Sequence, residues 1–160
     1  LCSNLDFAQT LLDYAEVTDA PEISQMQGLS LKPILEGTHP ASWRDAVYYR
    51  YWMHLAHHQI PGHYGVRDSR YKLVFFHGLP LDAKLGGGNF PPSTAGWEFY
   101  DLQQDPNETN NVYGKNEYAS EIRRMKQRLL DLKIEYDDRD DQYPELLKLR
   151  NQLWDNSTNE

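Results

Sequence analysis

Four short runs of aromatic and β-branched residues constrain the fold of this chain more than any other feature. Each is typical of a β-strand, and they cover residues 46–52, 64–68, 71–77 and 97–102. The second and third runs meet around Asp68, Ser69 and Arg70, which predicts a hairpin with a tight turn. Because successive strand side chains alternate between faces, Tyr71, Leu73 and Phe75 share one face. We expect a helix to cover that face.

A suitable helix follows the fourth run. Apolar side chains recur at alternating steps of four and three, at Tyr118, Ile122, Met125, Leu129, Leu132 and Tyr136. This spacing forms one apolar seam, and about three heptads are short for a coiled coil, so the helix is expected to lie on the sheet. The sequence therefore predicts an α+β fold, in which a four-stranded antiparallel sheet packs against a long C-terminal helix, with an N-terminal helical segment.

The first 40 residues show helix and turn patterns without a strand. Ser3 and Asp6 fit a capping box, and Leu5, Ala8, Leu12 and Ala15 form an apolar stripe over residues 4–16. We therefore expect three parts. Residues 1–40 form a helical segment that continues from a missing domain, residues 41–136 form an α+β subdomain with its packing helix, and residues 137–160 form an acidic tail with a short helix.

Composition excludes several classes of function. The net charge of −8 over 160 residues argues against nucleic acid as a partner, because neutralising phosphates requires an excess of Lys and Arg. No apolar run is long enough to predict a membrane span. A single cysteine precludes an internal disulfide. Because the chain begins with Leu1 and has no signal-peptide pattern, we expect it to be an excised piece of a longer protein.

Five motifs in order resemble the C-terminal part of type I sulfatases, the formylglycine-dependent enzymes. They are NLDFAQTLLDYAEV, MQGLSLKPILEG, WRDAVYYRYW, HYGVRDSRYKLVFF and FYDLQQDPNETNN, spread over residues 4–111. The last is similar to the family pattern ELYDL-x-x-DP-x-E-x-x-N, although Gln9 stands where the first family motif has proline. The likeness is greatest to bacterial N-acetylglucosamine-6-sulfatase-like and mucin-desulfating enzymes.

The resemblance implies a parent enzyme that hydrolyses sulfate esters of carbohydrates with a formylglycine nucleophile and a calcium ion. It also implies a periplasmic or secreted location, on which the residues themselves give no information. The nucleophile arises within a C/S-x-P-x-R motif, and neither Cys2 nor any serine here begins one. No set of metal ligands is evident either. We therefore expect no cofactor in this chain and no catalysis by it alone, since an activated nucleophile and charge stabilisation supply most of the rate.

Four of the six histidines fall between residues 54 and 63, namely His54, His57, His58 and His63. Three readings remain open: a zinc site, contacts to sugar or sulfate, and exposed loop side chains. In the resembling enzymes this loop faces the substrate, which favours His58 and His63 as contacts. Arg67 belongs to a locally basic stretch at residues 44–72 that would attract a sulfated glycan, although strand arginines often only face solvent.

Two functions follow from these observations. The first is part of the substrate-pocket wall of a sulfatase, with the missing N-terminal catalytic domain and a sulfated carbohydrate as partners. The second is a free-standing module that binds carbohydrate or protein without catalysis.

Overall fold

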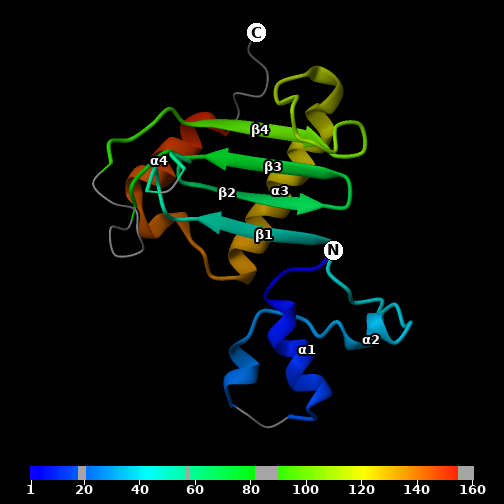
Figure 1. Ribbon diagram of the computed structural model, residues 1–160. Coiled ribbons are helices and arrows are strands. Elements are labelled where there is room, and N and C mark those ends of the chain that lie inside the picture. Colours follow the sequence, from blue (N-terminus) through cyan, green and yellow to red (C-terminus); the bar gives the residue numbers. More distant parts are fainter. Residues whose placement is uncertain (18–20, 57, 82–89, 155–160) are drawn as a thin grey trace. The chain divides into compact units, whose positions relative to one another are not determined.

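The computed structural model describes residues 1–17, 21–56, 58–81 and 90–154 (Figure 1). The chain divides into two compact units, residues 1–47 and 48–160. The first contains the helices α1 (Asp6–Tyr14), η1 (Pro21–Gln25) and α2 (Lys32–Leu35). After β1 (Ala46–Tyr51), the second contains β2 (His63–Asp68), β3 (Tyr71–Phe76), β4 (Gly96–Asp101), η3 (Asn116–Tyr118), α3 (Ala119–Glu135), η4 (Asp140–Gln142) and α4 (Pro144–Leu153).

The strands form one sheet in the order β1-β2-β3-β4, so each strand lies beside its neighbour in sequence (Figure 1). The β2–β3 hairpin pairs Tyr64 with Phe75, and β3 and β4 pair Leu73 with Phe99, both antiparallel. The predicted fold, a four-stranded antiparallel sheet with a long helix and an N-terminal helix, is confirmed.

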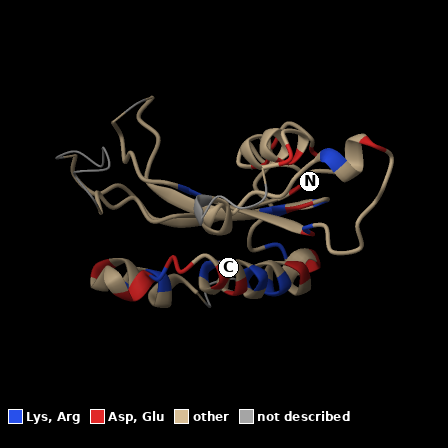
Figure 2. Cartoon of the chain, turned by 90° about the horizontal axis from the view of Figure 1, so that it is seen from below, with Lys and Arg blue, Asp and Glu red and all other residues tan. Residues whose placement is uncertain are grey.

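The core lies between the sheet and α3. Figure 2 shows α3 and α4 in one helical layer along a single face of the sheet. The sheet contributes Tyr64, Val66, Leu73, Phe75 and Phe99 to this core, and the helix contributes Ile122, Met125, Leu129 and Leu132. The expected strand face is therefore buried, because a period of two gathers apolar side chains on one side. The expected helical seam is buried as well, except at its ends, where Tyr118 and Tyr136 are half-buried.

Two buried lysines of α3 were not expected. Lys126 and Lys133 are each only 4% exposed. The Lys133 ammonium lies 4.0 Å from the centre of the Tyr64 ring, and the Lys126 ammonium lies 4.8 Å from the centre of the Trp97 ring. Aromatic faces attract cations, and the lysine stems bury like apolar side chains. The two lysines lie beside the apolar seam, and their side chains are buried because aromatic rings of the sheet face them there.

The turn after β4 is closed by two acidic side chains from the sulfatase-like motif. Asp101 accepts hydrogen bonds from the Arg70 guanidinium at 3.1 and 2.8 Å, which joins the end of β4 to the β2–β3 turn. Asp105 accepts hydrogen bonds from the Asn110 amide at 2.8 Å and the Thr109 hydroxyl at 3.1 Å. These contacts close the turn that precedes Pro106 and give the motif a structural role.

In the first unit, α1 buries its polar side. The helix is present, but its buried residues are Asp6 and Thr10, while Leu5, Phe7 and Leu11 are 53%, 62% and 70% exposed. Asp6 accepts hydrogen bonds from the backbone of Ser3 and Leu29 and from both terminal nitrogens of Arg44. Burial raises the pKa of Asp6, but these bonds outweigh it and leave the pKa lowered. Three of the four residues in the expected apolar stripe, Leu5, Ala8 and Ala15, are therefore exposed to solvent.

Candidate functional site

The face of the sheet away from α3 carries a row of aromatic rings across three strands. Tyr51 ends β1, His63 begins β2 and Phe76 ends β3, so all three lie at the same end of the sheet. The His63 ring stacks on Tyr51 at 5.2 Å and lies 4.8 Å from the Phe76 ring. Tyr64, the next residue after His63, points to the α3 side, where its hydroxyl donates to Asp140 at 3.0 Å. We call Tyr51, His63 and Phe76 the aromatic row.

His63 is half-buried in this row, and its protonation follows from its surroundings. Its Nδ1 lies 2.8 Å from the carbonyl oxygen of Pro61, which can only accept, so Nδ1 carries the proton. Nε2 is therefore the acceptor of the neutral ring. Burial lowers the pKa of His63 below 6.5. The ring is neutral at pH 7, and it offers an acceptor to a hydroxyl donor instead of a charge to an anion.

The loop between β1 and β2 is held from inside by His54. Its Nδ1 accepts the Gly62 N–H at 3.0 Å, so Nε2 carries the proton and donates to the Pro91 carbonyl oxygen at 3.0 Å. His54 is fully buried and ties the loop to the segment before β4. His58, in contrast, is exposed at the far end of the loop and adopts a left-handed backbone with φ of 56°. His57 lies outside the described residues.

Arg67 lies on the same face as His63, four residues further along β2. Strand geometry puts their Cα atoms roughly 13 Å apart. Arg67 is exposed, and none of the ion pairs within the described residues involves its guanidinium. Its cross-strand neighbour Lys72, in contrast, is paired with Glu108. Among the predicted contacts, His63 and Arg67 thus share one face, while His58 lies in the loop that leads into β2.

The comparisons with known proteins agree with this architecture. Residues 1–135 match the family described as "N-sulphoglucosamine sulphohydrolase, C-terminal". The chain belongs to this sulfatase C-terminal family.

Individual relatives support this membership. The chain is 41% identical over 139 residues to an N-acetylglucosamine-6-O-sulfatase of Bacteroides thetaiotaomicron, covering 86% of this chain and 22% of that protein. A structure solved in complex with its substrate D-glucosamine-2-N,6-O-disulfate matches with a TM-score of 0.67 and 39% identity, over 84% of this chain and 24% of that one. A 2-O glycosaminoglycan sulfatase shares the fold, with a TM-score of 0.59 and 24% identity. The chain thus spans about a fifth to a quarter of these proteins.

The relatives imply a metal-dependent parent enzyme, and calcium is the metal that the sequence resemblance predicts. Among the described residues, no three His, Cys, Asp or Glu side chains gather closely enough to hold a metal ion. These residues therefore do not fit a calcium centre. Among the described histidines of the loop, His54 is buried, His63 is half-buried and His58 is exposed. In the described ranges, no helix is both long and apolar enough to cross a membrane.

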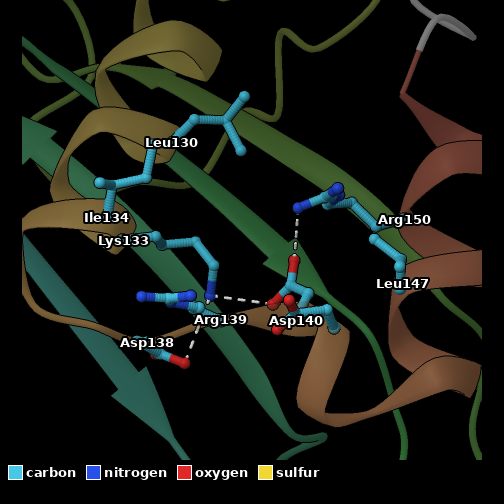
Figure 3. Close-up of a pocket in the computed structure, with 9 residues that line it drawn as sticks. Leu130, Lys133, Ile134, Asp138, Arg139, Asp140, Leu147 and Arg150 are labelled. Carbon is cyan, nitrogen blue, oxygen red and sulfur yellow. Dashed lines mark hydrogen bonds and ion pairs between the residues drawn. The ribbon is translucent and has the colours of Figure 1, made fainter.

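A cavity of about 260 Å³ lies between α3 and α4 (Figure 3). Four of its charged side chains form one network, in which Asp140 lies 2.9 Å from Lys133 and 2.7 Å from Arg150. Lys133 also lies 3.5 Å from Asp138. Because these charges neutralise each other, the cluster is suited to holding the two helices against the sheet rather than to binding a ligand.

Sequence reasoning missed the partners of His63. Tyr51 and Phe76 were assigned to strands, but nothing in a single strand shows which rings become neighbours across the sheet. Tyr49 belongs to the same surface, since its ring lies 5.9 Å from that of His63 and packs over Gly65. A Cβ at Gly65 would lie 2.8 Å from the Tyr49 hydroxyl oxygen, so this close approach requires glycine. The signal available was the alternation of aromatic residues in AVYYRYW.

Proposed function

We propose that this chain forms one wall of the substrate pocket of a sulfatase that acts on sulfated carbohydrate. The observation that carries the proposal is a combination on one strand face: an exposed arginine with no ion pair among the described residues, and a neutral histidine set among aromatic rings. A sulfated sugar has an anionic group, hydroxyl groups and an apolar ring face, and this surface offers a group for each of them.

Each side chain has a distinct role in this proposal. The Arg67 guanidinium pairs with a sulfate group, because a planar fork of donors matches the oxygens of a tetrahedral anion. Nε2 of His63 accepts a hydrogen bond from a sugar hydroxyl, while the Nδ1 contact to Pro61 fixes the orientation of the ring. His58 contacts the substrate from the exposed end of the loop, which the buried His54 holds in place.

The chemical step is assigned to the part of the parent protein that this chain does not span. No C/S-x-P-x-R motif occurs in the 160 residues. The exposed side of α1, with Leu5, Phe7 and Leu11, offers an apolar surface against which a catalytic domain would pack, because large adjoining apolar side chains rarely stay in water. The residues of this chain bind and orient the substrate and exclude water from it.

The 160-residue chain alone is expected to hydrolyse no chromogenic aryl sulfate above the buffer rate, with or without added calcium. The physical reason is the missing nucleophile, without which little acceleration remains. The measurement is product release at increasing protein concentration. Turnover that follows the protein through purification would contradict the assignment. Inactivity combined with binding of a sulfated glycan by the chain alone would favour the alternative, a free-standing carbohydrate-binding module.

In the full-length protein, Arg67→Ala is expected to weaken binding of a sulfated monosaccharide by about 1.5–3 kcal/mol, the usual value for a hydrogen bond to an ionised group. The matched control is Arg123→Ala, which removes an exposed arginine of α3 on the other side of the sheet. His63→Phe keeps the ring stack but removes the acceptor, and is expected to raise KM with little change in the free energy of unfolding. Equal effects of Arg67→Ala and Arg123→Ala on KM would exclude a specific role for Arg67.

A further inference from the structure

A cavity of about 340 Å³ opens where β3 ends and β4 begins, next to the aromatic row. Phe76, Gly96 and Glu98 line it from the two strands, and Thr94 lines it from the segment before β4. Phe76 and Gly96 are register partners. A Cβ placed on Gly96 would meet no atom within 4 Å, so the space beside the Phe76 ring is open. The cavity is thus lined by two aromatic residues, Phe76 and Trp97, and by a glycine.

The polar groups available in this cavity are few. Asn111 is used internally, since its Oδ1 accepts the backbone N–H groups of Phe99 and Tyr113 at 3.0 and 2.9 Å. One oxygen of Glu98, Oε2, accepts the Tyr100 hydroxyl at 2.8 Å. Its other oxygen has no hydrogen bond within the described part of the chain. This carboxylate oxygen and the exposed Thr94 hydroxyl are the groups that a bound molecule can use.

The charge of the cavity selects the class of ligand. Glu98 is the only charged side chain among the described residues that line it. A carboxylate accepts short, strong hydrogen bonds from hydroxyl groups but repels a sulfate, because two like charges a few ångströms apart cannot be stabilised without a cation between them. The neighbouring His63 supplies no such cation, since its ring is neutral.

We propose that this cavity binds an unsulfated sugar ring of the glycan, with the ring face on Phe76 and its hydroxyl groups on Glu98 and Thr94. The inference rests on the proposed function and deepens it, because it gives the substrate a direction along the sheet. The sulfated residue lies toward Arg67 on β2, and the unsulfated neighbour lies across the sheet, beside Phe76 of β3 and Glu98 of β4. Glu98 is therefore a specificity-determining residue that rejects a second sulfate at this position.

The test compares three glucosamine disaccharides as ligands of the full-length protein: unsulfated, sulfated on one ring, and sulfated on both. Isothermal titration calorimetry gives Kd for each. We expect the wild-type protein to bind the singly sulfated form at least tenfold more tightly than the doubly sulfated one. In Glu98→Gln this preference is expected to fall to less than threefold. The glutamine still accepts the Tyr100 hydroxyl, so folding is preserved.

Two controls separate this inference from the proposed function. Glu117→Gln makes the same charge change at an exposed residue of η3 and is expected to leave the preference unchanged. Phe76→Ala is expected to weaken binding of the unsulfated disaccharide, because it removes the aromatic face of the cavity. Equal binding of the two sulfated disaccharides by wild-type protein, or an unchanged preference in Glu98→Gln, overturns the cavity assignment. Unchanged binding of the sulfated ligands in Arg67→Ala would instead overturn the proposed function.

Discussion

Asp140→Ala is expected to lower the free energy of unfolding by about 3–5 kcal/mol, the usual cost of removing one partner of a buried ion pair. Asp140 is only 3% exposed and joins three elements. It accepts hydrogen bonds from Tyr64 of β2 and Arg150 of α4, and it lies 2.9 Å from the ammonium of Lys133 in α3. Without the carboxylate, the buried Lys133 keeps a single ion pair among the described residues, the longer contact to Asp138 at 3.5 Å.

Denaturant unfolding at pH 7 measures this loss, and the sequence provides a matched control. Asp141 is the next residue, also an aspartate, and is exposed. Asp141→Ala is expected to change the free energy of unfolding by about 0.5 kcal/mol or less, as surface substitutions usually do. Losses of similar size in the two variants would show that the Asp140 network does not hold α3 and α4 to the sheet.

Lowering the pH from 7 to 5 is expected to lower the free energy of unfolding by about 2 kcal/mol, because His77 binds a proton in the unfolded chain but not in the folded one. His77 is 1% exposed, and its Nδ1 accepts the Leu79 N–H at 3.1 Å. Burial, reinforced by the positive charge of Arg50, lowers its pKa from 6.5 to about 3. The unfolded chain protonates this ring below pH 6.5 while the folded chain does not, so stability is present above pH 6.5 and is lost as the pH falls toward 3.

The measurement is the free energy of unfolding at pH 7 and at pH 5, where most carboxylates remain ionised in both states. His77→Asn removes the titrating group and is expected to flatten most of this dependence, even if it lowers stability at both pH values. The remaining slope is assigned to His63, whose pKa is also lowered by burial. His39→Asn, at an exposed position, is the control and is expected to keep the wild-type slope. An unchanged slope in His77→Asn would contradict the neutral, buried state of His77.

The sequence by itself determined the sheet, its hairpin and the long helix. These elements follow from local periods: alternation in YKLVFF places Leu73 and Phe75 on one face, and steps of three and four place Ile122 and Leu129 on one seam. The face shared by His63 and Arg67 follows from their even spacing in one strand. The absence of a nucleophile motif could also be read directly, because that motif is contiguous.

Only the tertiary structure decided which polar groups are buried and which rings meet. Asp6 is buried on α1 because Arg44, 38 residues later, supplies its counter-charge. The rings of Tyr51, His63 and Phe76 come from three strands, and their contact depends on strand order and register, which no single segment encodes. The same holds for the cavity beside Gly96. A local pattern fixes the direction of a side chain along its own element, but long-range pairing sets its surroundings, and these surroundings set its charge and its function.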